Sequence, residues 1–328
     1  MYQMMSLPLY SGTLGEYNSW RDLGQELERL GCDGIEGVWG GEDLPKDLPA
    51  ELILGYHLIF YPDWLDFYRD DRAALKQKFG SLEVTASFYG GLGPDTLLEQ
   101  YRADLRRAVN LGARYVVFHV SDVSLEEGYT YRWLHTNQEV IDAAVEVVNL
   151  ILGEERWPFE FLVENQWWPG FTFTEPEETA RLLEGIRFAG KGILLDTGHL
   201  MNACTELKTE AEGADYIRRM LNRHGSLAKW VRGVHLHQSL SGAYVKAHTG
   251  SLPAGLPEDY MERFGVSYQH ILQIDQHRPW TDPAILSVLE QIEPRYLTHE
   301  LSSRGRMARA EAVSVQTRLL QQRGRMRV

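Results

Sequence analysis

The residues best suited to chemistry in this chain are histidines and carboxylates that close short apolar segments. Each of the following stands at or near the end of a different segment of this kind: His57, His119, Glu164, Asp196, His235 and Glu300. Imidazole nitrogen and carboxylate oxygen are ligands that zinc or manganese accepts without cysteine. If the segments are strands of one parallel barrel, their ends converge and these side chains meet at a metal site.

Further candidate ligands occur in two short motifs. His199 follows Asp196 by three positions in DTGH, and Asp275 and His277 form a D-x-H pair. A single histidine at a strand end is usually structural, and a lone carboxylate there often caps the next helix. Their joint occurrence favours metal binding. Because the whole set holds too many ligands for one ion, it predicts two or three divalent ions, with zinc expected.

The elements that must position these residues alternate in type along the chain. Strand-length apolar segments are found at residues 3–9, 33–39, 52–58, 114–120, 159–165, 191–197, 231–237 and 295–301. Apolar residues spaced by three and four predict helices at residues 20–31, 97–112, 139–153, 176–186, 214–225 and 282–292. This alternation predicts the α/β class, as a (β/α)₈ TIM barrel. An open doubly wound sheet is the rival fold, but no GxGxxG follows the first strand.

The domain organisation predicted from this pattern is one barrel over residues 1–303 and a basic C-terminal helix or tail over residues 304–328. Extra length falls at residues 61–94 and 239–274, directly after strands, so we expect extended loops over the catalytic face. The basic segment holds arginines at 304, 306, 309, 318, 323, 325 and 327. It is interpreted as a helix with a solvated end, the alternative being a basic arm.

Composition limits the partners and the compartment. The formal charge is -13, which argues against wide contact with duplex nucleic acid, because such binding depends on Lys and Arg. Two cysteines, Cys32 and Cys204, suit a reducing compartment, and no segment is apolar enough to cross a bilayer. The expectation is a cytoplasmic protein with a small-molecule substrate and no membrane partner. The sequence specifies no oligomeric state.

Seven short motifs link the chain to a known superfamily. In order, they are GYHL, VVFHVS, LVENQWWPG, LLDTGHL, GVHLHQS, IDQHRPW and THEL. Together they resemble the xylose-isomerase-like TIM barrels, which include endonuclease IV, sugar phosphate isomerases and epimerases, and cobamide-remodelling phosphodiesterases. The resemblance covers essentially the whole barrel.

The resemblance to the endonuclease IV branch implies three metal sites. The first would contain His57, His119 and Glu164. The second would share Glu164 and add Asp196, His235 and Glu300. The third would contain His199, Asp275 and His277. In the epimerases of the superfamily the second group alone typically holds one ion.

The chain also departs from its relatives near the predicted site. Gln238 stands where relatives carry an aspartate, and Pro279 and Trp280 replace a glycine-rich turn, which suggests a reshaped substrate pocket. Residues predicted to bind or orient the substrate are His237, Arg278, Trp168 and Trp280.

Two functions follow from these residues. The first is a metal-dependent hydrolase of a non-polymeric phosphodiester, such as a corrinoid nucleotide loop, with clustered zinc ions. The second is a sugar or sugar-phosphate isomerase or epimerase, in which Glu164 and Glu300 exchange a proton through an enediolate beside one manganese or cobalt ion. Glu164 and Glu300 are the predicted catalytic residues. A scaffold that binds metal without activity is the third and least favoured interpretation.

Overall fold

Eight parallel strands close into a barrel within residues 1–322, the part of the chain that the computed structural model describes. Each strand pairs with the next in sequence, and β1 also pairs with β8. The strands are β1 (Tyr2–Leu9), β2 (Gly34–Trp39), β3 (Ile53–His57), β4 (Tyr115–His119), β5 (Glu160–Glu164), β6 (Lys191–Asp196), β7 (Val231–His235) and β8 (Tyr296–His299). The predicted (β/α)₈ barrel is therefore confirmed.

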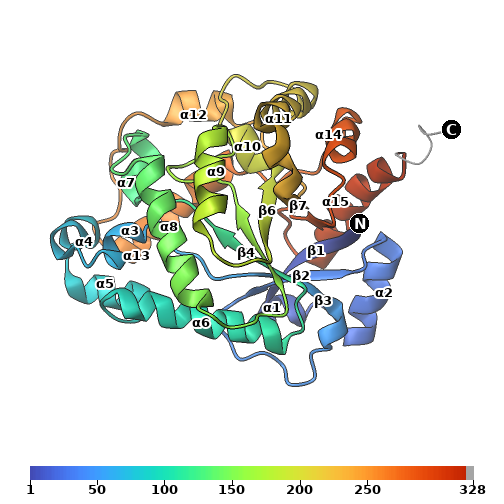
Figure 1. Ribbon diagram of the computed structural model, residues 1–328, viewed down its shortest axis with the longest axis horizontal. Helices are drawn as coiled ribbons and strands as arrows, with labels where there is room; N and C mark the ends of the chain where they lie inside the picture. Colours follow the sequence, from blue (N-terminus) through green and yellow to red (C-terminus); the bar gives the residue numbers. More distant parts are fainter. Residues whose placement is uncertain (323–328) are drawn as a thin grey trace.

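The predicted helices form the outer layer of the barrel (Figure 1). They are α2 (Trp20–Leu30), α6 (Pro94–Asn110), α8 (Asn137–Leu152), α9 (Pro176–Gly185), α11 (Glu210–His224) and α14 (Ala284–Ile292). Local signals fix their ends. In α2, the Ser19 side chain accepts a hydrogen bond from the Asp22 amide, and Gly31 ends the helix with a φ of 74°.

The barrel interior is filled by side chains rather than open. Met4, Leu54, Tyr115, Leu162 and Tyr296 are among the residues that pack together inside it. A second and larger apolar core lies between the strands and the outer helices. Because this interior is packed, the polar strand ends meet at the mouth and not within a channel.

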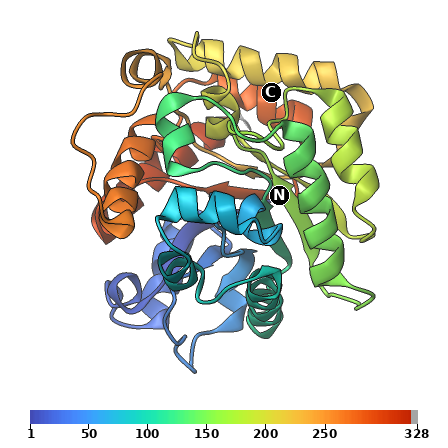
Figure 2. The same ribbon diagram turned by 90° about the vertical axis from the view of Figure 1, so that its left-hand side faces the viewer.

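The two long insertions are mostly helical. The first contains α3 (Leu65–Tyr68), α4 (Arg72–Phe79) and α5 (Leu82–Tyr89), and the second contains α12 (Gly242–His248) and α13 (Tyr260–Ile274). Figures 1 and 2 show α3, α4, α7 (Leu125–Thr130) and α13 gathered at one end of the molecule. The rings of Phe79 and Tyr260 lie 4.4 Å apart, so the two insertions pack on each other. The remaining short elements are α1 (Ser11–Leu14), η1 (Ala50–Leu52), α10 (Thr197–Asn202) and η2 (Gly225–Trp230).

The predicted basic segment contains α15 (Arg306–Gln321), which packs against α2. Arg306 lies 2.7 Å from Asp22 and 2.8 Å from Glu26, and Arg309 pairs with Glu16. These arginines are thus neutralised within the chain. Arg323, Arg325 and Arg327 of the same predicted segment lie outside the described residues. Over residues 1–322, no helix has both the length and the apolar character that a membrane span requires.

Candidate metal centre

The candidate ligands are placed by the ends of the strands. Five of them are the last residues of β3 to β7, and the sixth follows β8 directly: His57, His119, Glu164, Asp196, His235 and Glu300. Strand register brings neighbours together, because His119 is paired with Glu164 and Asp196 with His235. The structure therefore gathers these residues at one mouth.

The first cluster consists of His57, His119 and Glu164. The Nε2 atoms of the two histidines lie 3.0 Å apart, and they lie 3.3 and 3.1 Å from Oε2 of Glu164. Ligand atoms about 2 Å from one tetrahedral ion are roughly 3.3 Å from each other. Nδ1 of His57 lies 2.8 Å from the Leu58 carbonyl, which fixes the ring with Nε2 toward the cluster.

The second cluster shares Glu164 and adds Asp196, His235 and Glu300. Nδ1 of His235 lies 3.2 Å from Oε1 of Glu164 and 2.9 Å from Oε2 of Glu300. Oε2 of Glu164 faces the first cluster, so the two oxygens of this one carboxylate point to different clusters. Glu164 thus offers one oxygen to each cluster.

The DTGH motif links the second cluster to a third. Asp196 is the N-cap of α10, and its Oδ1 accepts a hydrogen bond of 2.6 Å from the His199 amide. The cap sets the position of His199, whose Nδ1 lies 3.2 Å from Oε1 of Glu164. Gly198 is required here, because a Cβ at that position would lie 2.0 Å from Cε1 of His237.

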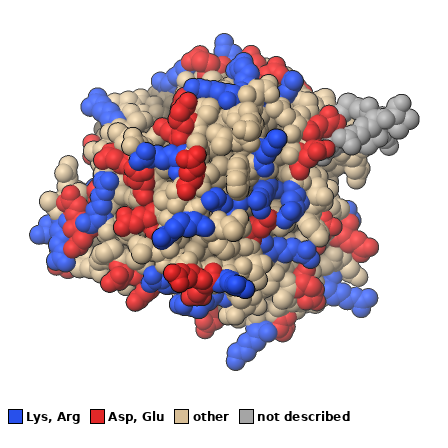
Figure 3. All heavy atoms as spheres, viewed as in Figure 1, with Lys and Arg blue, Asp and Glu red and all other residues tan. Residues whose placement is uncertain are grey.

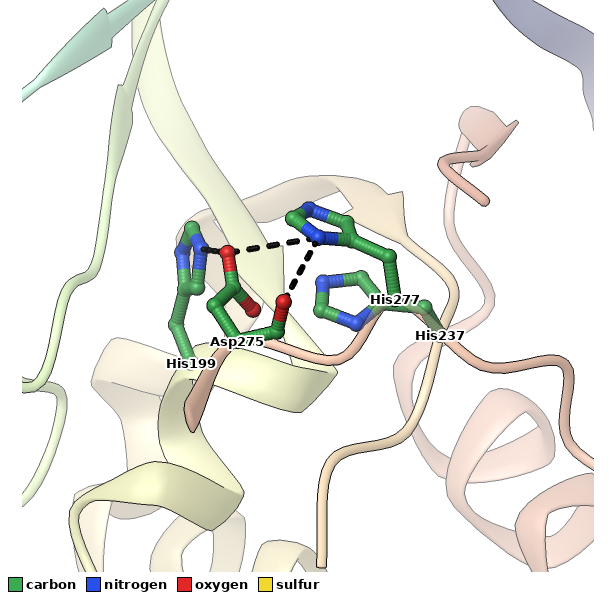
Figure 4. Close-up of side chains that lie close together, drawn as sticks. All are labelled: His199, His237, Asp275 and His277. Carbon is green, nitrogen blue, oxygen red and sulfur yellow. Dashed lines mark hydrogen bonds and ion pairs between the residues drawn. The ribbon is translucent and has the colours of Figure 1, made fainter. Parts of the chain in front are cut away.

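The third cluster brings His199, Asp275 and His277 together with His237 (Figure 4). Oδ2 of Asp275 lies between the two predicted histidines, 3.3 Å from Nε2 of His199 and 3.3 Å from Nδ1 of His277. The His237 ring stacks on that of His277 with centroids 4.2 Å apart. His237, predicted as a substrate contact, also offers a ring nitrogen to this group of possible ligand atoms.

Electrostatics keep the carboxylates ionised. Burial raises the pKa of Glu164, but His119 and His235 outweigh it and hold that pKa well below its ordinary value. Burial likewise opposes ionisation of Asp275, yet His277 and His199 lower its pKa to about 2. For His235, burial lowers the pKa, and the carboxylates of Glu300, Glu36 and Glu164 raise it well above the usual range. The clusters thus concentrate negative charge where a cation would bind.

The donor set fits divalent ions. Each cluster offers only nitrogen and carboxylate oxygen, with at least one carboxylate to offset the charge of the ion. Asp275 Oδ1 and His237 Nδ1 are buried, and neither has a hydrogen-bond partner among residues 1–322. Buried polar atoms normally have partners, so these two atoms are consistent with a ligand at the third cluster.

One supporting residue, Glu36 of β2, was not predicted from the sequence. Its Oε1 lies 2.8 Å from Nε2 of His235, and its Oε2 accepts hydrogen bonds from Tyr115 and Thr298 at 2.6 and 3.0 Å. This contact turns Nδ1 of His235 toward the second cluster. The signal in the sequence was a glutamate inside the apolar segment DGIEGVW.

We expect Glu36→Gln to weaken metal binding at the second cluster by about 10-fold to 100-fold, the usual effect of losing a carboxylate behind a ligating histidine. Competition with a chromophoric chelator would measure the affinity of each site. The first cluster should keep its affinity, because its histidines do not contact Glu36. Equal affinities for the variant and the parent at every site would contradict this role.

The aromatic and cationic residues predicted to contact the substrate differ in where the structure places them. Trp168 lines a cavity beside the clusters. Arg278 is exposed, its backbone pairs with Gln238, and it is not among the described residues that line this cavity. Its predicted substrate contact therefore remains a prediction.

Trp280 does not fit its predicted role, because it is fully buried behind the third cluster. Its Nε1 donates a 2.8 Å hydrogen bond to the His237 carbonyl, and its amide donates to Oε1 of Gln316 in α15 at 2.9 Å. Nε2 of Gln316 in turn donates to the Leu236 carbonyl at 2.8 Å. Trp280 and Gln316 thus support the end of β7 from outside the barrel.

Comparisons with known proteins agree with this architecture. The chain is similar to the structure of a D-tagatose 3-epimerase-like protein, with 15% identity, a TM-score of 0.54 and full coverage (100%) of both chains. It is similar to endonuclease IV from Thermus thermophilus, with 16% identity, a TM-score of 0.53 and coverage of 98% of this chain and 100% of that one. L-ribulose 3-epimerase gives 12% identity, a TM-score of 0.54 and coverage of 100% and 97%. These low identities show a shared fold.

A search of curated proteins finds no match. A family model described as the xylose isomerase-like TIM barrel matches residues 25–314, which include every candidate ligand named above. With most of its 328 residues inside that match, the chain belongs to the xylose isomerase-like TIM barrel family.

Proposed function

We propose that this chain is a metal-dependent hydrolase of a non-polymeric phosphodiester, with two or three zinc ions. The observation that supports this most is the position of Glu164. One of its oxygens lies beside His57 and His119, and the other lies beside His235 and His199. A shared carboxylate suits adjacent ions that act together on one phosphoryl group.

The residues of the chain have separable roles in this proposal. Divalent zinc, when bound, supplies Lewis acidity that polarises phosphoryl oxygens and acidifies water. His57, His119 and Glu164 would hold one ion, and Glu164, Asp196, His235 and Glu300 another. Glu300 also lines the cavity. Burial raises its pKa, but His235 and His277 lower it well below the ordinary value, so Glu300 is ionised and suited to hold a cation.

The phosphodiester is proposed to be non-polymeric because the chain is acidic overall. The nucleotide loop of a corrinoid contains one phosphodiester of this kind. It is a candidate substrate because the chain resembles the cobamide-remodelling phosphodiesterases. The cavity beside the clusters measures about 630 Å³, which suits part of a large ligand or the whole of a small one.

A sugar isomerase or epimerase is the second candidate, and the second cluster favours it. Glu164, Asp196, His235 and Glu300 alone form a complete set for one ion, and solved structures similar to this chain include L-ribulose 3-epimerase. In that case His57 and His119 would have no metal to bind. Metal analysis of the purified protein separates the two functions, since two or three zinc ions per chain favour the hydrolase and one manganese or cobalt ion favours the isomerase.

We expect negligible cleavage of duplex DNA that contains an abasic site. The formal charge is -13, and basic and acidic side chains are interspersed on the face shown in Figure 3. A polyanion therefore meets repulsion rather than a continuous basic track. The measurement is an incision assay with zinc-loaded protein at moderate salt. Efficient incision there would show that a polymeric phosphodiester is accepted.

A further inference from the structure

The cavity beside the clusters has two chemically different sides. On one side stand candidate ligands, among them His57, His119 and Glu300. On the other side stand apolar and aromatic residues, among them Phe88 from the first insertion, Phe264 from the second and Trp168 from the segment after β5. A ligand that fills the cavity therefore touches metal ligands at one end and apolar surface at the other.

Helix α13 of the second insertion supplies much of the apolar side. Seven of its residues line the cavity, and five of these are apolar or aromatic and recur at helical spacing: Met261, Phe264, Tyr268, Ile271 and Leu272. Residues at this spacing share one face of a helix. That face would be expected to pack into the core, yet Met261 and Tyr268 remain 53% and 52% exposed. The apolar stripe thus faces the cavity.

Contacts with the first insertion hold α13 in place. The ring of Phe264 lies 5.4 Å from that of Phe88 in α5, and the ring of Tyr260 lies 4.4 Å from that of Phe79 in α4. At the other end of the helix, Asp275 is the C-cap and belongs to the third cluster. The helix is therefore fixed relative to the clusters, which makes its inner face a defined wall.

The exposed lining of the cavity is mostly apolar, and some of its polar side chains are engaged with other residues of the chain. Among its described lining residues there is no lysine or arginine. The Ser124 hydroxyl donates to Glu127 at 2.6 Å, and Gln166 lies 3.0 Å from Nδ1 of His199. Ser267 offers a buried hydroxyl and Trp168 a buried Nε1, each without a partner among residues 1–322. Such a lining suits neither the many hydroxyls of a free sugar nor a second phosphate beyond the clusters.

We propose that the cavity-facing side of α13 binds a bulky apolar group of the substrate, attached to the phosphodiester that reacts at the clusters. This inference rests on the proposed function for the identity of the reacting group. The substrate class is then an amphipathic phosphodiester, with a single anionic group and a large apolar or ring-bearing substituent. Burial of that substituent against Met261, Phe264 and Tyr268 supplies binding free energy in proportion to its apolar area.

The test compares p-nitrophenyl phosphodiesters whose second ester group is methyl, phenyl or naphthyl. The leaving group is constant, so differences in kcat/KM report the second group. We expect the naphthyl ester to exceed the methyl ester by at least about tenfold, which corresponds to ~1.4 kcal/mol. The ratio should fall toward one in the double variant Met261→Ala with Tyr268→Ala. Val266→Ala is the matched control, since Val266 is exposed on the same helix but does not line the cavity, and it should keep the parent ratio.

A binding measurement separates this inference from the hydrolase proposal. Naphthylmethylphosphonate and methylphosphonate are not hydrolysed, and calorimetry gives their affinities for the metal-loaded parent and the double variant. If the diesters are hydrolysed with a naphthyl-to-methyl ratio of kcat/KM near one, the proposed apolar binding site on α13 is wrong and the hydrolase proposal is retained. If no diester is hydrolysed, but the parent binds naphthylmethylphosphonate about tenfold more tightly than methylphosphonate and the double variant loses this preference, the apolar binding site is supported and the hydrolase proposal is wrong. Equal phosphonate affinities without hydrolysis would overturn both.

Discussion

Glu164→Gln is expected to lower phosphodiesterase activity by roughly 10²-fold to 10³-fold. The variant loses the negative charge that offsets buried positive charge at the site, and an uncompensated buried charge is costly. The amide keeps the shape of the side chain but removes the negative charge beside His57, His119, His199 and His235. Since Glu164 belongs to both the first and the second cluster, zinc should be lost from both. Steady-state kinetics and zinc content per chain, measured on the same preparation, check this prediction.

Glu160→Gln is a matched control for this variant, because it makes the same change at the opposite end of β5. Glu160 pairs with Arg232 and Arg295 and contacts no cluster residue in the described chain. The Glu160→Gln variant should retain the zinc content and activity of the parent. If Glu164→Gln also keeps the parent zinc content, Glu164 is not a shared ligand and the proposed bridge is wrong.

His119→Ala is expected to remove one zinc ion per chain and most of the activity together. Nε2 of His119 lies 3.1 Å from Oε2 of Glu164 and 3.0 Å from Nε2 of His57, so its loss leaves the first cluster with two ligands. Two ligands hold zinc poorly, because structural and catalytic zinc sites use three or four from the protein. Elemental analysis of the variant beside the parent gives the change in metal count.

The same variant distinguishes the two candidate functions. A mononuclear isomerase would depend on the second cluster, to which His119 does not belong. Its metal content would then be unchanged, with an effect on substrate binding alone. His248→Ala, a change at an exposed histidine on α12, controls for the loss of an imidazole. If the parent protein binds one ion and the His119→Ala variant still binds that ion, the multinuclear hydrolase is ruled out.

The barrel and the positions of its strand ends were predictable because both depend on local patterns. A short apolar run such as YVVFH, closed by a polar residue, is almost sufficient to define a buried parallel strand and its polar end. The helices of the insertions were harder to predict. In α13, Gly265 lies inside the helix and lowers its helix propensity. The apolar stripe of this helix faces a cavity rather than the barrel, so neither propensity nor expected burial indicated the helix.

Supporting contacts between distant segments were not predictable. Glu36 lies in the interior of a strand and acts on a residue almost two hundred positions away, His235. Trp280 was predicted at the mouth because it follows the D-x-H pair closely, but its indole turns toward the His237 carbonyl instead. Which way a large side chain turns after a motif depends on the tertiary space around it, and sequence spacing does not specify that space.

The order in which the ligands occur along the chain affects how the centre is assembled during synthesis. His57, His119 and Glu164 are translated before any other ligand, while Glu300 comes last and Gln316 later still. Strand β1 pairs with β2 and β8, so the barrel stays open until β8 has been made. Because translation adds only about 5–20 residues per second, the three earliest ligands exist for seconds on an unfinished barrel. The second cluster therefore cannot be complete until Glu300 has been added and β8 has closed the barrel.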